Sequence, residues 1–314
     1  MKIIRDYHFV KPEDQGATAA IGNFDGVHLG HQSVIKLAKS ALPDAPLGIV
    51  TFEPHPRAYF TPDTAPFRLM SQTARTSQLE KLGVNNLYEL PFNAEMATLS
   101  PREFAERIIC EGLGLSHIVI GADFSFGNKR AGSANNLVGF GAEMGFGVTI
   151  APLLEQSVAT ISSTAIRQTL TDGRPQEAAE MLGHWHRIEG PVIAGEQRGR
   201  TLGYPTANMS IDGLLPPAFG VYAVLVDVLD GPHQGQFHGV SSLGKRPMFG
   251  ENHPNLETFL FNFSGDLYGS CLSIALVEYL REEEKFQGLE ALVKQMDSDS
   301  ARAQCIWLHY EQSY

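Results

Sequence analysis

I-G-N-F-D-G-V-H-L-G-H, from Ile21 to His31, is the stretch of sequence from which the fold can be predicted outward. The run at 17–21 before it is small and apolar, which favours a buried strand. The run at 32–41 after it carries apolar residues at helical spacing. The stretch is therefore predicted to be a strand-to-helix turn, where free backbone N–H groups and the helix dipole favour an anion.

Three glycines and two histidines give this turn its chemistry. Gly22, Gly26 and Gly30 allow the backbone to bend sharply and a phosphate to approach closely. His28 and His31 are three residues apart, so both rings lie on one face of the first helical turn. The pair is compatible with a zinc site, but zinc needs a third protein ligand that no nearby motif supplies. The alternative is that the two imidazoles grip phosphates during phosphoryl or nucleotidyl transfer.

Length and composition set the class of protein. A chain of 314 residues predicts about two domains. The net charge of −11 argues against a nucleic-acid backbone as the main partner. Cys110, Cys271 and Cys305 lie far apart and are predicted to be reduced. Residues 1–10 lack the apolar core of a signal peptide, and no apolar run is long enough to span a membrane. We therefore expect a soluble, cytoplasmic protein.

The first half alternates predicted strands and helices. The strands are expected at 17–21, 47–52, 86–90, 118–120 and 147–151, with helices at 32–41, 75–82, 100–111 and 135–143 between them. This alternation predicts an α/β fold with a doubly wound parallel sheet. Such sheets bind ligands beyond the carboxyl ends of their strands.

Two loops follow strands of this sheet. His55 lies between two prolines, which predicts a rigid extended turn with an exposed ring, at an edge that can also bind ligand. The loop at 121–130 reads G-A-D-F-S-F-G-N-K-R. Phe124 and Phe126 suit either the core or a planar ring, and Asp123 with the basic pair at its end suits a ligand that also carries phosphates.

A further helix start reads I-S-S-T-A-I-R. One hydroxyl is explained by capping alone. Three successive hydroxyls, including those of Ser163 and Thr164, with Arg167 one turn later, suggest a second phosphate site at a helix start.

The pattern changes from residue 188 onward, so we place the domain boundary near 185. Short apolar runs separated by Gly and Pro are expected to form strands at 188–194, 221–229, 237–242, 256–263 and 272–279. This spacing predicts a small antiparallel barrel. A helix is expected at 289–310, interrupted near 297–300 where Ser and Asp can cap it again.

The segment 199–208, G-R-T-L-G-Y-P-T-A-N, is the richest motif of the second half. Gly199 and Gly203 free the backbone to wrap phosphates. Thr206 and Asn208 are two apart on an extended chain, so their oxygens share one face and suit Mg²⁺. A plain turn of the same composition is the alternative.

These motifs together resemble a known family. G-x-F-D-G-x-H-x-G-H is similar to the nucleotide-binding signature of bacterial FMN adenylyltransferases, members of the HxGH nucleotidyltransferase group with a Rossmann-like fold. The loop at 121–130 and the segment at 161–167 resemble further motifs of that group. P-T-A-N resembles the motif of riboflavin kinases. Over nearly its whole length the chain resembles the bacterial bifunctional riboflavin kinase/FMN adenylyltransferase, or FAD synthetase, family.

The resemblance implies an FMN adenylyltransferase domain at 1–184 and a riboflavin kinase domain at 185–314. It implies riboflavin, FMN and ATP as substrates, and Mg²⁺ held by Thr206 and Asn208. Glu257, before D-L-Y-G, would be the catalytic base of the kinase, and His28, His31 and Arg167 would stabilise charge during adenylyl transfer. Met248 stands where the family usually has Thr.

The same resemblance assigns the residues that contact ATP or flavin. They are Gly22, Asn23, Phe24, Asp25, Gly26, Gly30, His55, Asp123, Phe124, Phe126, Ser163, Thr164, Gly199, Gly203, Thr206 and Asn208.

Two other functions share part of this pattern. A nucleotidyltransferase for another acceptor, such as a nicotinamide or pantetheine phosphate, also uses H-x-G-H but leaves the second domain unexplained. A flavin-binding sensor without turnover leaves Glu257 and the Thr206–Asn208 pair without a use.

Overall fold

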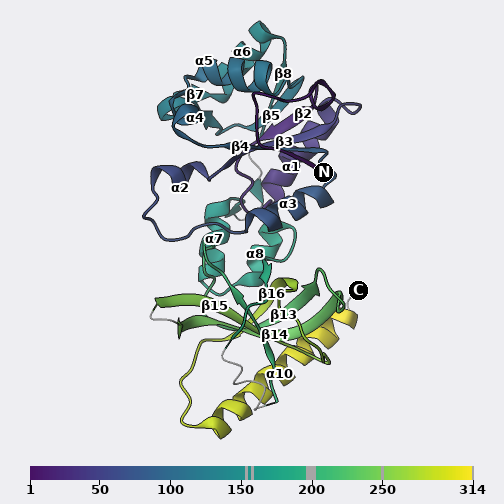
Figure 1. The fold of residues 1–314 in the computed structure, drawn as a ribbon, viewed down its shortest axis with the longest axis vertical. Helices are drawn as coiled ribbons and strands as arrows, with labels where there is room; N and C mark the ends of the chain where they lie inside the picture. The colour runs from purple at the N-terminus through teal and green to yellow at the C-terminus, as the bar shows by residue number, and fades with distance from the viewer. Residues whose placement is uncertain (153–154, 157–158, 196–202, 249–250, 313–314) are drawn as a thin grey trace. The chain divides into compact units, whose positions relative to one another are not determined.

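The computed structural model describes the chain apart from residues 153–154, 157–158, 196–202, 249–250 and 313–314, and it forms two compact units (Figure 1). Unit 1 joins Met1–Thr64 with Arg75–Ile161, and unit 2 joins Ala65–Ala74 with Ser162–Tyr314. The chain passes from unit 1 to unit 2 between residues 161 and 162. The sequence predicts a domain boundary later, after residue 184.

The cluster around Leu69 explains why the helices at 163–182 belong to unit 2. These helices are α7 (Ser163–Thr171) and α8 (Pro175–Leu182). Leu69 packs in one buried cluster with Ile166, Leu170, Ala178 and Leu182. Apolar burial therefore ties the two helices to the segment at 65–74.

Unit 1 contains a six-stranded, entirely parallel sheet. The strands are β1 (Lys2–Ile4), β2 (Thr18–Ile21), β3 (Leu47–Glu53), β4 (Asn86–Pro91), β5 (His117–Gly121) and β8 (Gly147–Ala151), in the order β1-β4-β3-β2-β5-β8. The predicted doubly wound sheet is confirmed. Strand β1 was not predicted, because its short sequence at an edge carries no alternating pattern.

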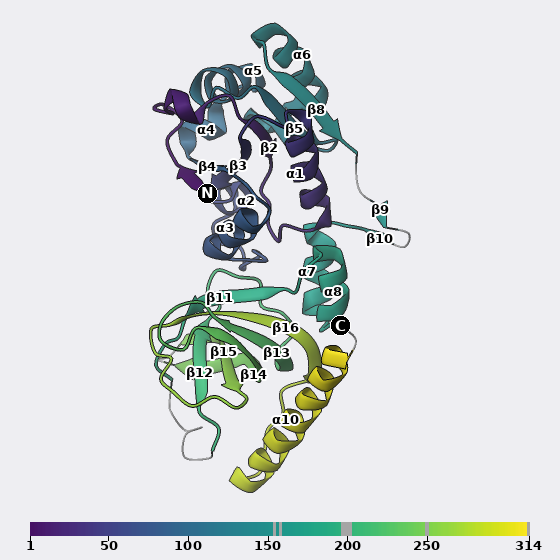
Figure 2. The same cartoon turned by 90° about the vertical axis from the view of Figure 1, so that its right-hand side faces the viewer.

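Helices cover both faces of this sheet. Figure 2 shows α1 (Leu29–Ala41) along one face, where the Thr18 hydroxyl donates to the Ala38 carbonyl at 2.9 Å. The other face packs in a core cluster with the helix η2 (Phe104–Gly112) and with α6 (Ala134–Met144). The shorter elements of unit 1 and the segment joining the units are η1 (Pro12–Asp14), α2 (Pro56–Phe60), α3 (Gln72–Lys81), α4 (Ala94–Thr98), α5 (Pro101–Glu103), β6 (Ser125–Phe126), η3 (Asn128–Arg130), β7 (Gly132–Ser133), β9 (Glu155–Gln156) and β10 (Ala159–Thr160).

The predicted helix start at Ser100 is confirmed as a capping box. The Ser100 hydroxyl accepts from the Glu103 N–H at 3.2 Å, and the Glu103 carboxylate accepts from the Ser100 N–H at 2.8 Å. From Phe104 onward the helix is a π-helix, which the sequence pattern did not indicate.

Unit 2 contains a nearly closed antiparallel barrel. Its strands are β11 (Arg187–Pro191), β12 (Thr206–Ser210), β13 (Gly220–Val228), β14 (Gly235–Met248), β15 (Glu251–Leu260) and β16 (Cys271–Arg281), in the order β11-β16-β13-β14-β15-β12. A bridge from Ile193 to Asn208 draws the two edges together. The predicted small antiparallel barrel is confirmed.

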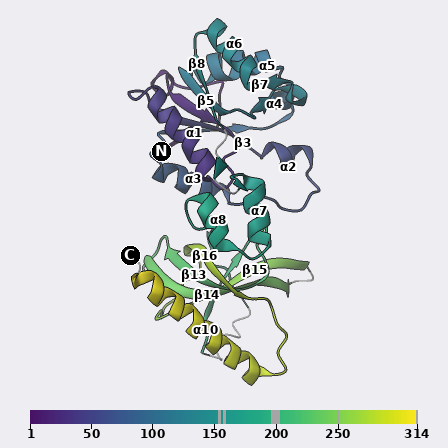
Figure 3. The same cartoon turned by 180° about the vertical axis from the view of Figure 1, so that it is seen from behind.

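The C-terminal helix α10 (Leu289–Gln312) lies along β13 and β14 (Figure 3). The expected interruption near 297–300 is wrong, since the helix is continuous there. Asp297 accepts a hydrogen bond from the Tyr204 hydroxyl, and Asp299 forms a two-oxygen ion pair with Arg281. These side chains bind neighbouring elements and do not cap the helix.

His186 makes the stability of unit 2 dependent on pH. Its ring is buried, Nε2 is 2.8 Å from the Leu69 carbonyl, and burial lowers its pKa to about 4. In the unfolded chain the His186 ring takes up a proton near pH 6.5, whereas in the folded unit the same ring stays uncharged down to about pH 4. The free energy of unfolding should therefore fall as pH drops from about 6.5 toward 4, by up to about 3 kcal/mol.

The test is urea unfolding followed by tryptophan fluorescence, because both tryptophans, Trp185 and Trp307, lie in unit 2. His186→Gln keeps a donor for Leu69 and should flatten the dependence on pH between 6.5 and 4. His233→Gln is the control and should leave it unchanged. An unaltered pH dependence in His186→Gln would contradict the assignment.

Candidate active site

The turn after β2 has the geometry of an anion-binding helix start. Phe24, Gly26 and Val27 all have positive φ, at 51°, 89° and 42°. The Val27 N–H donates to the Phe24 carbonyl at 3.2 Å, and Gln32 Nε2 donates to the Val27 carbonyl at 2.9 Å. The turn is therefore fixed by its own hydrogen bonds and by the first turn of α1.

The two histidines are brought together as predicted. His28 is the N-cap of α1, and its Nδ1 accepts from the His31 N–H at 3.3 Å. The rings stack with centroids 3.7 Å apart and planes inclined by 17°. Burial and the neighbouring His28 lower the pKa of His31 well below its usual value, so His31 is neutral near pH 7.

Gly30 is required by this stack. A Cβ at position 30 would lie 3.0 Å from His28 Cε1 and 3.1 Å from His28 Nδ1. The Nδ1 of His31 is buried without a hydrogen-bond partner in the part of the chain that the structure describes. A buried nitrogen of this kind is available to a ligand.

Other predicted residues of this turn differ in exposure. Phe24 is 1% exposed and lies 5.1 Å from the His31 ring, so it supports the histidine from the core. Asp25 is also buried, whereas Asn23 is exposed. The Asn23 carbonyl accepts from the Thr51 hydroxyl at 3.3 Å. Contact of the Phe24 ring with a ligand stays a prediction.

The predicted extended turn at His55 is a helix cap. Nδ1 of His55 accepts from the Arg57 N–H at 3.0 Å and starts α2, with Pro56 at its first position. The sequence analysis predicted an extended turn here and no helix; a helix starts directly after His55, because proline fits the first helical position, where its missing N–H is not needed.

An aromatic cluster that the sequence analysis missed follows His55. Tyr59, Phe60 and Phe92 have ring centroids 5.2–5.7 Å apart, all edge to face. Phe60 is 62% exposed. The cluster lies after the carboxyl ends of β3 and β4, the edge of the sheet that carries the histidines. Its signal in the sequence is weak, since two aromatics in a short helix usually face the core.

The loop after β5 has one aromatic residue in the core and other residues that reach the surface. Phe126 is 6% exposed and packs on Phe104, whereas Phe124 is half-buried and stacks on Phe126 with centroids 5.6 Å apart. Asp123 is exposed. Of the two roles that the sequence allowed for these aromatics, Phe126 takes the one in the core. Phe124 and Asp123 are accessible to a ligand.

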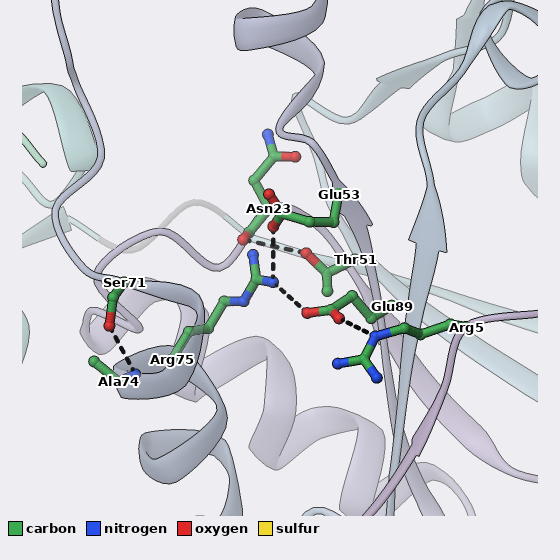
Figure 4. A network of polar contacts seen from close by, with 8 residues as sticks. All are labelled: Arg5, Asn23, Thr51, Glu53, Ser71, Ala74, Arg75 and Glu89. Carbon is green, nitrogen blue, oxygen red and sulfur yellow. Dashed lines mark hydrogen bonds and ion pairs between the residues drawn. The ribbon is translucent and has the colours of Figure 1, made fainter. Parts of the chain in front are cut away.

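A buried ion network supports the β3 and β4 ends of the same edge (Figure 4). Arg75, 4% exposed, donates to Glu89 at 2.9 Å and to Glu53 at 3.3 Å. Arg5 donates to the second oxygen of Glu89 at 2.9 Å. Figure 4 shows α3 bringing Arg75 to this point, with Ser71 capping the helix at the Ala74 N–H. The network fixes Glu53 two residues before His55.

The residues of the second helix start lie on α7 in unit 2. Ser162 is the cap and accepts from the Ala165 N–H at 3.2 Å. Ser163 and Thr164 follow in the first turn, and Arg167 donates to the Phe67 carbonyl at 2.7 Å. Capping explains Ser162, and the roles of the other three toward a phosphate stay predictions.

The barrel brings the second predicted site together. Thr206 and Asn208 lie on β12, and Asn208 pairs directly opposite Glu257 on β15. Opposed residues of an antiparallel ladder project from the same face. Asn255, which the sequence analysis did not single out, donates to Asn208 Oδ1 at 2.9 Å and to Glu257 Oε1 at 3.5 Å.

A cavity that is partly open to solvent adjoins this face. Its lining includes Thr206 and Asn208, together with the segment 263–268. Two oxygen donors at the wall of such a cavity fit Mg²⁺, which completes its shell with water and substrate. No group of three or more His, Cys, Asp or Glu side chains that could hold a metal ion is found among the described residues.

Two predicted positions of the phosphate loop remain. Gly199 lies outside the described residues. Gly203 has φ of 81° and no atom within 4 Å of a Cβ placed there, so it supplies the turn before β12. The side chain of Met248 is also outside the described set.

Comparison with known proteins adds to this geometry. The protein-family model for FAD synthetase matches residues 10–165, and that for riboflavin kinase matches residues 182–307. The bifunctional riboflavin kinase/FMN adenylyltransferase of Pseudomonas fluorescens is 40% identical over 98% of both chains. The Bacillus subtilis protein of the same name is 36% identical over 96% of both. The chain belongs to the bifunctional riboflavin kinase/FMN adenylyltransferase family.

The FAD synthetase domain is thus N-terminal and the riboflavin kinase domain C-terminal, and the substrates of this family are riboflavin, FMN and ATP. A solved structure titled a macrolide-efflux protein from Streptococcus pneumoniae has a TM-score of 0.81 and 31% identity, covering 95% of this chain and 96% of its own. Macrolide efflux is named there for the Streptococcus pneumoniae protein. In this chain, none of the helices that the structure describes has the length and apolarity to cross a membrane.

Gly30→Ala tests the histidine stack. The added Cβ would push the His28 ring aside by a few tenths of an ångström. The rate of adenylyl transfer should therefore fall, by less than the roughly 10²-fold that a misplacement of about 1 Å costs. Gly139→Ala on α6 is the matched control, since nothing lies within 4 Å of its added Cβ. The measurement is FAD formed from FMN and ATP, with FMN formation from riboflavin as internal reference. Equal rates in both variants would contradict the requirement for glycine.

Arg75→Met tests the buried network. Removing Arg75 leaves the buried Glu89 carboxylate with the exposed Arg5 as an ion-pair partner, and the free energy of unfolding of unit 1 should fall by about 3 kcal/mol. Far-UV circular dichroism reports both units, whereas tryptophan fluorescence reports unit 2 alone. Only the first signal should shift to lower urea. Arg102→Met, which removes an exposed ion pair with Glu143, is the control and should shift neither.

Proposed function

We propose that the two reactions of the family use two separate groups of side chains, one in each unit. Unit 1 would transfer AMP from ATP to FMN at the start of α1, and the barrel would phosphorylate riboflavin at the face shared by β12 and β15. One observation carries this proposal: a stacked histidine pair at a helix start in one unit, and an Asn208–Glu257 pair beside a cavity in the other.

In unit 1 the triphosphate of ATP would lie against the first turn of α1 and the turn 22–26. His28 and His31 donate to phosphate oxygens, and neutral His31 does so through the nitrogen that carries its proton. The phosphate of FMN attacks the α-phosphorus, the new P–O bond forms, and pyrophosphate leaves. Since the nucleophile is already an anion, no side-chain base is needed, and stabilisation of charge is the main task of the site.

The exposed aromatics at the same edge suit the flavin ring. A planar isoalloxazine can stack on Phe60 and Tyr59, and Phe124 offers a second apolar face after β5. His55 and Asp123 are the polar groups next to these aromatics. Ser163, Thr164 and Arg167, at the start of α7, are proposed to bind phosphate oxygens of a substrate.

In the barrel Glu257 accepts the proton of the terminal ribityl hydroxyl of riboflavin. The oxygen attacks the γ-phosphorus of ATP, giving FMN, and ADP leaves. Thr206 and Asn208 would hold Mg²⁺, which supplies neutralisation of phosphate charge when bound. Gly199 and Gly203 are proposed to contact the phosphates of ATP. With ATP and flavins as substrates, we propose that the protein works in the cytoplasm.

Two single substitutions separate the reactions. Glu257→Gln should lower FMN formation by about 10²- to 10⁴-fold and leave FAD formation from FMN unchanged. His28→Ala should do the reverse, because it removes a charge-stabilising donor from unit 1 only. Chromatographic analysis of the products from riboflavin, FMN, ATP and Mg²⁺ measures both reactions. Loss of both activities in each variant would count against two independent sites.

A further inference from the structure

Asn255 lies between two residues that the kinase reaction is proposed to use. It is on β15 two residues before Glu257, so both side chains project from one face of the strand. Its Nδ2 donates to Asn208 Oδ1 at 2.9 Å and to Glu257 Oε1 at 3.5 Å. One carboxamide therefore bridges side chains on two neighbouring strands.

The amide of Asn208 has little freedom on its other side. Its Nδ2 donates to the Thr206 carbonyl at 3.4 Å, and it lies 2.5 Å from the position of a Cβ on Gly195, so the backbone there closes against it. An asparagine side chain has one oxygen and one nitrogen, and a donor beside it selects the oxygen. Asn255 thus determines that the oxygen of Asn208, and not its nitrogen, is turned toward the Asn255 amide.

Without a donor between them, the amide oxygen and the carboxylate would repel each other across the ladder. Two N–H groups of one amide reach both acceptors, with a short bond to Asn208 and a longer one to the Glu257 carboxylate. A base and a metal ligand that are held before the substrate arrives lower the barrier of the chemical step.

We propose that Asn255 is a positioning residue of the riboflavin kinase site, which holds the Asn208 oxygen and the Glu257 carboxylate in fixed register through its two N–H groups. The inference rests on the proposed roles of Asn208 and Glu257. Position 255 lies in neither P-T-A-N nor the strand predicted at 256–263, so motif matching alone does not reach it. Its position follows from the pairing of β12 with β15.

Asn255→Leu tests the role, since it removes both donors at similar volume. The kcat of FMN formation should fall at least roughly 10-fold, with the KM for riboflavin little changed. Asn255→Gln keeps the carboxamide and should restore part of kcat. Gln236→Leu, which removes an exposed amide that donates to Asp227 on another strand pair, is the matched control and should keep the wild-type rate.

Two further measurements separate positioning from stability. The side-chain amide signals of Asn208 in a ¹H–¹⁵N spectrum should shift in Asn255→Leu without substrate, while the urea midpoint of unit 2 stays close to wild type. Wild-type kcat in Asn255→Leu would overturn the proposal. A lowered urea midpoint with no rescue by Asn255→Gln would also overturn it, in favour of a structural role.

The Glu257→Gln background distinguishes this inference from the function on which it rests. Asn255→Leu should add little to the loss already caused by Glu257→Gln, because the two side chains act as one unit. Full additivity would overturn the proposal for Asn255. If Glu257→Gln alone keeps the wild-type rate, the proposed base fails, while the Asn208 amide signals still report whether Asn255 orients that side chain.

Discussion

The parallel pairing of β2 with β5 is the constraint on which the first site depends. Strands β3 and β4 lie on one side of β2, and β8 lies on the far side of β5, so the order of winding reverses between these two strands. Connections from neighbouring strands at such a point leave toward opposite faces of the sheet, and the residues at their carboxyl ends are left accessible. The histidine turn and the Phe124 loop are the segments that leave these two ends.

In the barrel, the register of strand pairing brings the side chains of the second site together. Asn208 meets Glu257 because β12 and β15 pair at those residues, and a slip by one residue would turn Glu257 into the apolar interior. A buried bond of 2.7 Å between the hydroxyls of Ser241 and Thr258 favours the existing register of β14 and β15. Hydroxyl pairs inside the barrel thus help to place carboxylate and amide groups on its other face.

Burial sets the electrostatics of both units. Desolvation keeps His31 and His186 uncharged, each with a lowered pKa. Arg75 and Glu89 remain buried as charges only because they are paired. A neutral imidazole at the start of a helix is compatible with the positive end of the dipole, and a charged one would be repelled there.

The sequence by itself determined the fold class, both chemical motifs and most strands, because these depend on local periodicity and on residue type. It indicated the stack of His28 and His31 through their spacing alone. Tertiary structure decided what depends on contacts between distant segments: the short strand β1, the unbroken α10 and the pairing of Asn255 with Asn208. It also placed Phe126 in the core and Phe60 at the surface, since an aromatic side chain carries no local signal of the face it will occupy.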